Sequence, residues 1–264
     1  MQQRIPWSRD ELLVAFALYC QIPFGRLHKG NPEIVRIAEA IGRTPSALAM
    51  KLVNIAGLDP AITSTGRVGL PNASAGDREM WDEMHADWER FAVESDRALA
   101  AVKAATELGG TTNQKAESYG SGPVGPDLHS GEERVMLTST RVGQDFFRRA
   151  VLSAYDDKCC ITGLGVPKLL VASHIVPWRV DPANRLNPRN GLALSALHDK
   201  AFDLGLITLL PDLTVQVSAK YSDLRDGYFT AAIESFAGSR IATPDKFAPD
   251  PEFLAYHRSV VFQG

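Results

Sequence analysis

Apolar and polar residues follow a helical period through most of the first half of the chain. From Ser8 to Cys20 the apolar residues gather on one face, and Ser8 and Glu11 have the spacing of a capping box, so a helix is predicted to begin there. Residues 74–108 repeat the helical pattern over a longer stretch. Its apolar side carries large residues typical of a helix packed in a core, namely Met80, Trp81, Met84, Trp88 and Phe91.

Two shorter helices are predicted between these segments. Asn31–Pro32 and Thr44–Pro45 each combine an N-cap residue with a proline that suits the first helical turn, and Gly42 and Gly57 stand where the helices would end. Such a pair is either a DNA-binding helix-turn-helix or a plain helical hairpin, and the pattern leaves both open. As a helix-turn-helix, its second helix would present Arg43, Ser46 and Lys51.

The second half combines helical and strand patterns. Residues 168–178 indicate a short strand that ends at His174, because Pro177 cannot donate to a strand ladder. A brief strand that runs into a short helix is predicted over residues 192–203, followed by two strands about a turn at Pro211–Asp212. Before all of these, a helix is predicted from the spacing of Phe146, Phe147, Ala150, Val151 and Ala154.

The composition changes between these two halves. Residues 109–131 are rich in Gly, Ser, Thr and Pro and poor in apolar side chains, which predicts a flexible linker. We therefore expect an all-helical domain over residues 1–108 and a second domain over residues 132–264. The expected fold class is α+β, with the strands confined to the second domain.

Charge and cysteine content restrict the function further. The net charge of the 264 residues is −3, so any contact with nucleic acid must be local. No apolar run approaches the roughly 18 residues of a membrane span, and the first residues lack a signal-peptide pattern, so we expect a cytoplasmic protein with no membrane partner. The three cysteines, Cys20, Cys159 and Cys160, suit a reducing compartment and include no CxxC pair for structural zinc.

Three residues of the second half are candidates for catalysis: His174, Asn190 and His198. The predicted elements place them on a strand, a loop and a helix. Each has an ordinary structural alternative, since a lone histidine is commonly a core residue and an Asn-Gly pair is the strongest hairpin-turn signal. The order of the three residues decides between these alternatives, together with the sequence around them.

The stretches "LLVASHIVPW" and "NPRNGLALSALHDKAFDLGLITL" resemble the restriction-type branch of the HNH nucleases. The resemblance covers roughly residues 135–262 and ends with "FLAYHRSVVF". It implies a ββα-metal fold, in which a hairpin and a helix hold one divalent ion. The first half resembles only a helical module often joined to such nucleases, which says little about its ligand.

In such a site each residue has a chemical role. His174, neutral near pH 7, takes a proton from water. His198 is the candidate metal ligand, and Asn190 either holds the loop that bonds His174 or itself binds the ion. Asp203 is a further candidate ligand, or else it buttresses the helix. The expected cofactor is one divalent ion, Mg²⁺ or Mn²⁺, with Zn²⁺ or Ni²⁺ as alternatives.

The chain departs from the family pattern in two ways. Many HNH sites have Asp or His just before the base, where this chain has Ser173, a weak ligand for a hard cation. Water, phosphate or Asp203 would then complete the metal shell. The paired CxxC motifs of zinc-stapled HNH proteins are absent, which leaves Cys159 a packing role.

The expected partner is DNA, held by basic residues that outnumber acids around the motif. Such contacts fix the position of a duplex and read no sequence. Trp178 either packs in the core or touches the minor groove. The candidate contacts are Arg43 and Lys51 in the first half and Arg141, Arg148, Arg149, Lys168, Arg179, Arg185 and Arg189 in the second.

The sequence therefore predicts a metal-dependent HNH endonuclease that cleaves DNA, with restriction of foreign or modified DNA as its setting. An alternative of another class is a DNA-binding regulator whose HNH domain has lost catalysis, which Ser173 favours. A third is a nuclease that acts on RNA or nicks one strand. An enzyme that cuts both strands with one site per chain would most simply be a homodimer.

Overall fold

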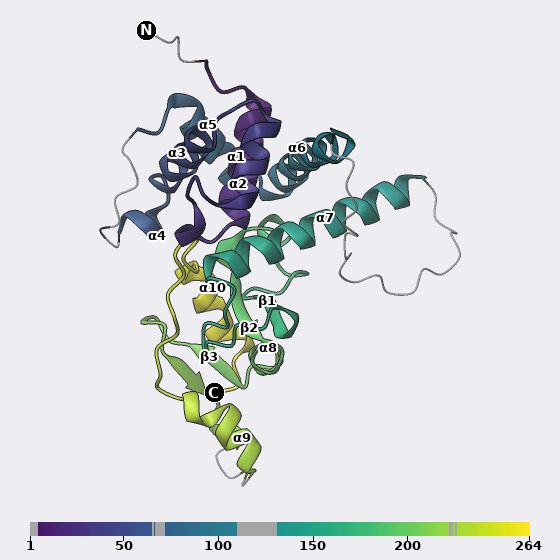
Figure 1. Cartoon of the computed structure of the whole chain (residues 1–264). Helices are drawn as coiled ribbons and strands as arrows, with labels where there is room; N and C mark the ends of the chain where they lie inside the picture. The colour runs from purple at the N-terminus through teal and green to yellow at the C-terminus, as the bar shows by residue number, and fades with distance from the viewer. Residues whose placement is uncertain (1–4, 65, 67–71, 110–130, 222–223, 225) are drawn as a thin grey trace.

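The computed structural model of the chain describes residues 5–64, 66, 72–109, 131–221, 224 and 226–264 (Figure 1). For residues 107–109 and 131–140 it describes the backbone alone. Helices form the first half, and helices with short strands form the second, so the α+β class is confirmed.

The first half contains the helices that the sequence predicts. The capping box of Ser8 and Glu11 begins the first of them, and Asn31 and Thr44 are the N-caps of the predicted pair. The long periodic segment is divided in two, because the backbone leaves the helical region at Asp87 (φ −153°, ψ 88°). The helices are α1 (Arg9–Gln21), α2 (Pro32–Ala40), α3 (Pro45–Ala56), α4 (Pro60–Thr63), α5 (Ala75–Ala86) and α6 (Trp88–Gly109).

The second half is built around two antiparallel strand pairs. Strand β1 (Leu170–His174) ends at His174, as predicted, and pairs with β2 (Gly191–Ser195) so that His174 lies opposite Gly191. β2 runs directly into α8 (Ala196–Asp203), which contacts both strands. The remaining elements are α7 (Gly131–Ala154), β3 (Ile207–Leu209) paired with β4 (Val215–Val217), α9 (Gly227–Ala232) and α10 (Pro251–Tyr256).

Asn190 and Gly191 do not form the hairpin turn that their sequence suggests. Asn190 ends a short 3₁₀ turn, Pro188–Asn190, and Gly191 is already the first residue of β2. The glycine is required because α7 lies close: a Cβ atom at position 191 would come within 2.4 Å of Val151 Cγ2 and 2.9 Å of Phe147 Cζ. The Asn-Gly pair therefore serves packing and the site rather than chain reversal.

Helix α7 lies between the two halves and contacts both (Figure 1). Phe146 packs against Trp88 and Phe91 of α6, with ring centroids 6.5 and 6.1 Å away. The next residue, Phe147, stacks instead on His174 at the end of β1. Buried side chains of both halves consequently form one continuous hydrophobic core.

A buried lysine joins the halves at a second point. Lys246 is fully buried, and its Nζ donates to the carbonyls of Tyr19, Cys20 and Ile22 at the end of α1. An ammonium group is favourable there because a helix ends in unpaired carbonyls that carry partial negative charge. Burial nevertheless lowers the pKa of Lys246 to about 8.

The predicted linker, residues 109–131, lies almost entirely outside the described residues, and the division into two domains stays a prediction. The structure shows only that the segments on either side of it share a core.

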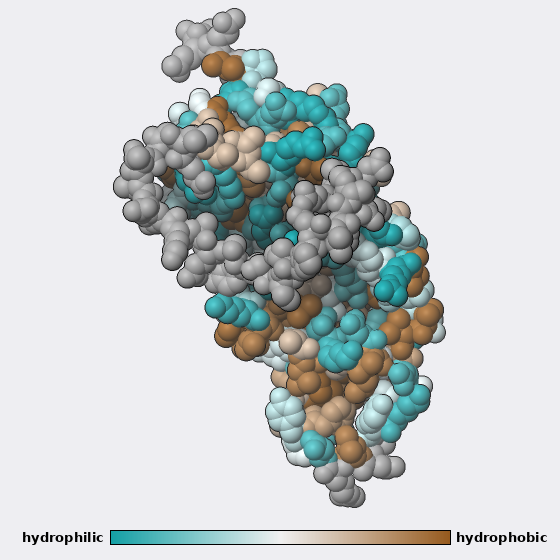
Figure 2. Space-filling view, turned by 90° about the vertical axis from the view of Figure 1, so that its right-hand side faces the viewer, coloured by the Kyte–Doolittle hydropathy of each residue, from teal (hydrophilic) through white to brown (hydrophobic). Residues whose placement is uncertain are grey.

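The surface of the two halves differs. Figure 2 shows hydrophobic side chains gathered over the C-terminal half of the visible face. No helix of the described residues is long and apolar enough to cross a membrane. Most large apolar side chains that are exposed belong to the second half: Val166, Leu169, Val180, Leu197, Leu204, Leu224, Tyr228 and Val260.

Replacing Lys246 by methionine should lower the free energy of unfolding by about 2–4 kcal/mol, because three buried carbonyls lose their donor. Urea unfolding followed by tryptophan fluorescence measures the change. The control is Lys158→Met, which removes an exposed ion pair with Asp156 and should cost less than about 0.5 kcal/mol. Equal effects of the two substitutions would show that Lys246 does not join the halves.

Candidate active site

His174 lies half-buried at the end of β1, between two aromatic rings. Its imidazole stacks on Phe147 of α7, with centroids 4.0 Å apart and planes inclined by 8°. The ring of Trp178 meets it edge-on at 5.5 Å. Two large rings on different segments therefore fix the orientation of the imidazole.

The hydrogen bonds of His174 define its tautomer. Nε2 lies 2.9 Å from the carbonyl oxygen of Arg185. A carbonyl can only accept, so Nε2 carries the proton and Nδ1 keeps its lone pair. Burial lowers the pKa of His174, and the Arg185 carbonyl and the charge of Asp199 oppose this shift only in part. The side chain is therefore neutral near pH 7, as a proton acceptor must be.

Asn190 holds the loop that carries this hydrogen bond. The side chain is fully buried; its Oδ1 accepts from the Val176 N–H at 2.8 Å, and its Nδ2 donates to the carbonyls of Val176 and Asn184, both at 3.2 Å. Asn184 directly precedes Arg185, the residue that bonds His174. Oδ1, the atom through which an Asn side chain would bind a cation, is buried and already accepts a hydrogen bond, which favours the loop-holding alternative over metal ligation.

His198 lies in the first turn of α8 and is only 3% exposed. Its Nδ1 is 2.9 Å from the hydroxyl of Ser195, the N-cap of the same helix, and its ring packs edge-on against Phe236 at 5.3 Å. Nε2 is buried and makes no hydrogen bond of normal geometry, although the Ala232 carbonyl lies close enough to interact with the ring. Burial lowers the pKa of His198, although the Ala232 carbonyl acts in the opposite direction. His174 and His198 share no hydrogen bond or ring contact.

Asp199 is a further candidate site residue, which the sequence motif did not single out. Its charge acts on two neighbours: it raises the pKa of His174, and it adds to the effect of burial in raising the pKa of Asp203. Within the described residues Asp199 makes no hydrogen bond or ion pair. The signal was present, since Asp199 and Asp203 are four residues apart and so share one side of a predicted helix.

An open pocket of about 390 Å³ lies beside His174. Aromatic rings form part of its wall and an amide and a guanidinium add polar groups, as at many ligand sites. Its lining comes from α7, β1 and the loop after β1: Gln144, Phe147, Arg148, Val171, Ala172, His174 and Trp178.

The six arginines among the predicted DNA contacts of the second half fall into two groups. Arg148 donates to the carbonyls of Leu170 and Pro167, Arg149 pairs with Asp96 at 2.9 Å, and Arg189 pairs with Asp250 at 3.0 Å, so these three side chains are engaged within the protein. Three others have no ion pair among the described residues: Arg141 and Arg179, which are exposed, and Arg185.

Arg43 and Lys51 are not available to DNA in this structure. Arg43 bonds to Glu11 at 2.7 Å and to backbone carbonyls before α1, with its guanidinium over Trp7. Lys51 is 6% exposed and pairs at 2.7 Å with the fully buried Asp77. Both cations hold the helical half together. The prediction that they contact DNA is not supported, because Glu11 and Asp77 lie 32 and 26 positions away from them and no local pattern reveals such partners.

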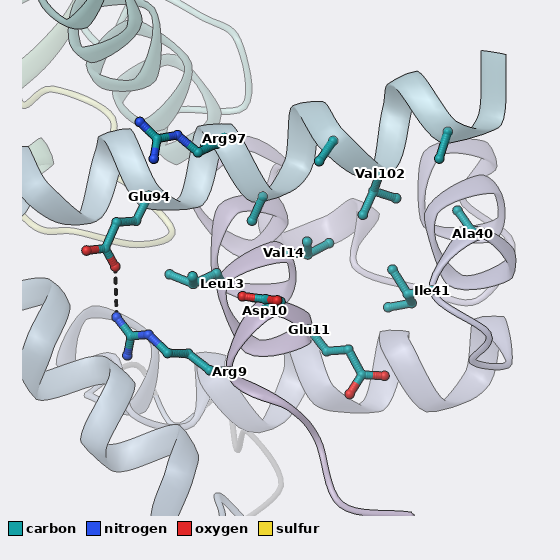
Figure 3. Close-up of a pocket in the computed structure, with 13 residues that line it drawn as sticks. Arg9, Asp10, Glu11, Leu13, Val14, Ala40, Ile41, Glu94, Arg97 and Val102 are labelled. Atoms are coloured by element: carbon teal, nitrogen blue, oxygen red, sulfur yellow. Dashed lines mark hydrogen bonds and ion pairs between the residues drawn. The ribbon is translucent and has the colours of Figure 1, made fainter. Parts of the chain in front are cut away.

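A larger pocket of about 790 Å³ lies in the helical half, between α1, α6 and the end of α2 (Figure 3). Leu13, Val14 and Val102 contribute apolar side chains to it, and Arg9 bonds to Glu94 at 2.8 Å on its rim. It shares no lining residue with the pocket beside His174, so it is separate from the candidate active site.

Comparison with known families assigns the segment around His174. Residues 159–210 match the sequence model of the HNH endonuclease family, and the match includes β1, the loop after it, β2, α8 and β3. This part of the chain is a domain of that family, as the resemblance predicted. A comparison with curated proteins gave no match.

Replacing Asn190 by alanine should make the loop around Arg185 more mobile. The Arg185 carbonyl would then bond to His174 less firmly, and the imidazole would become more exposed to solvent. We expect a loss of about 1–3 kcal/mol in the free energy of unfolding, because buried backbone groups lose their partners. We also expect the pKa of His174, measured by NMR titration, to move up toward the ordinary value for histidine.

The matched control is Asn31→Ala, which removes the N-cap of α2 and should cost about 1 kcal/mol without affecting His174. An unchanged pKa of His174 in the Asn190 variant would contradict the positioning role.

Proposed function

We propose that the protein is a metal-dependent endonuclease that hydrolyses phosphodiester bonds of DNA, acting in the restriction of foreign or modified DNA. The family match supports an endonuclease of the HNH type. The observation that carries the proposal is the state of His174: a neutral imidazole beside an open pocket, with Nε2 bonded to the Arg185 carbonyl and Nδ1 free to accept a proton.

In the proposed reaction His174 Nδ1 takes a proton from water. The water oxygen bonds to phosphorus while the bond from phosphorus to the 3′ oxygen breaks, and the departing oxygen takes a proton from solvent. A positioned base of this kind contributes about 10²–10⁴ in rate. The stacked Phe147 and the Arg185 carbonyl keep the imidazole in one orientation, which the proton transfer requires.

Two observations on α8 support a site for a divalent ion. His198 Nε2 is a buried nitrogen without a well-formed hydrogen bond, with the Ala232 carbonyl nearby, and such a nitrogen is unusual in a folded protein. The carboxylate of Asp199 makes no hydrogen bond or ion pair among the described residues. A nearby cation would relieve its repulsion of Asp203. We propose that His198 and Asp199 hold the ion, with Asp203 as a further ligand. When bound, the ion would polarise the scissile phosphate and neutralise charge on the leaving oxygen.

The nitrogen and oxygen donors of this set suit Mn²⁺, Zn²⁺ or Ni²⁺, and Mg²⁺ would rely on the carboxylates and water. Ser173 Oγ is also buried without a hydrogen bond and could add a weak ligand.

One observation favours the alternative, a DNA-binding regulator with an inactive HNH domain. Within the described residues no group of three or more His, Cys, Asp and Glu side chains is arranged to hold a metal. Incubation of the purified protein with plasmid DNA and Mg²⁺ or Mn²⁺ separates the two functions. Cleavage supports the nuclease, and binding without cleavage supports the regulator. The same assay with RNA, and the ratio of nicked to linear product, tests the remaining alternatives.

His174→Ala should reduce the single-turnover cleavage rate by at least about 100-fold and leave DNA affinity nearly unchanged, because only the proton acceptor is lost. Since burial lowers the pKa of His174, the base stays neutral to lower pH than free histidine, and the wild-type rate should begin to fall only below about pH 6.5. The control, His28→Ala, changes an exposed histidine and should cut normally. Normal cutting by a folded His174 variant would refute the base assignment.

His198→Ala and Asp199→Asn should each weaken Mn²⁺ binding about 10-fold or more in calorimetric titrations without DNA. Asp10→Asn, an exposed acid in the helical half, is the control and should leave the isotherm unchanged. If both α8 variants bind Mn²⁺ like the wild type, the metal site lies elsewhere.

A further inference from the structure

Arg185 differs from Arg148 and Arg189 in that its guanidinium is bound by no carbonyl or carboxylate within the described part of the chain. Arg148 and Arg189, close by in the same domain, are held by carbonyls or a carboxylate. The Nε of Arg185 is buried and makes no hydrogen bond, and its guanidinium forms no ion pair among the described residues. Buried donors nearly always have a partner, so the state of this one is unusual.

The position of Arg185 is fixed even though its charge is unpaired. Its guanidinium lies over the ring of Trp178, 5.4 Å from the centroid. The edge of that ring contacts His174, and the backbone carbonyl of Arg185 accepts the hydrogen bond from His174 Nε2. Asn190 holds the preceding carbonyl, that of Asn184. One residue is thus tied to the imidazole through its backbone and through the ring beneath its side chain.

We propose that Arg185 contacts the scissile phosphate and stabilises the negative charge that develops on its oxygens during cleavage. The inference rests on the proposed nuclease function and assigns Arg185 a catalytic role beyond general DNA contact. A guanidinium presents several donors in one plane, which matches phosphate oxygens, and it is effective where water is partly excluded.

Arg179 provides the matched comparison. It lies next to Trp178 in sequence, is exposed, and has no ion pair within the described part of the chain. A cation of this kind contacts DNA phosphates without acting on the reaction. The two arginines should therefore separate binding from catalysis: loss of Arg179 should weaken affinity, and loss of Arg185 should slow the chemical step.

The experiment compares Arg185→Gln, Arg185→Lys and Arg179→Gln with the wild type in the full-length protein. The single-turnover rate is measured with saturating protein and Mn²⁺, and DNA affinity is measured in EDTA at several salt concentrations. Arg185→Gln should lower the rate by at least about 100-fold with little change in affinity. Arg185→Lys, which keeps the charge but not the planar group, should recover part of the loss.

Arg179→Gln should cut at the wild-type rate at saturation, and the slope of log affinity against log salt should become shallower by about 0.9. A normal rate for Arg185→Gln, or a defect in affinity alone, would overturn the inference. Thermal melting of both Arg185 variants verifies that they are folded.

The pH dependence distinguishes direct contact from an effect through His174. Because the substitution keeps the backbone carbonyl that bonds Nε2, the acid limb of the rate profile should stay in place in Arg185→Lys. A displaced limb would show that Arg185 acts by positioning the base and would overturn the direct contact. A wild-type protein that binds DNA but never cleaves it would overturn the nuclease function, and the inference with it.

Discussion

The packing of two consecutive phenylalanines on α7 is the constraint on which the rest of the structure depends. Phe146 enters the core of the helical half against Trp88 and Phe91, and Phe147 carries the imidazole of His174 on its face. Neighbouring positions on a helix point about 100° apart, so one turn of α7 packs against both halves of the continuous core. The candidate base is thereby fixed to a helix whose other side is buried in the helical half.

Much of the fold follows from local signals in the sequence. Capping residues such as Ser8, Asn31 and Thr44 mark helix starts correctly because each bonds to backbone groups within three residues of itself. Lys246 shows where such reasoning ends. A lysine is ordinarily a surface residue, and its burial under α1 depends on carbonyls more than 200 positions away, which no local pattern contains.

The candidate site likewise combines features that the sequence predicts with features that only the structure reveals. His174 could be found from sequence because strand, proline and family motif coincide there, whereas the use of its two nitrogens depends on a loop carbonyl that only the structure locates. Arg43 and Arg185 look alike in the sequence, yet one is bonded to Glu11 and the other has no charge partner among the described residues. For cations, availability is decided by the partners that folding supplies, and composition does not record it.

The close contact at Gly191 bears on how this nuclease domain can be exchanged between proteins. The family match begins at Cys159, after α7 has ended. A gene fusion that transferred residues 159–210 alone would leave Gly191 facing solvent in place of Val151 and Phe147, and His174 would lose the ring beneath it. The smallest transferable unit must therefore include the last turns of α7. Recombination of this domain is then constrained by a helix that lies outside the matched segment.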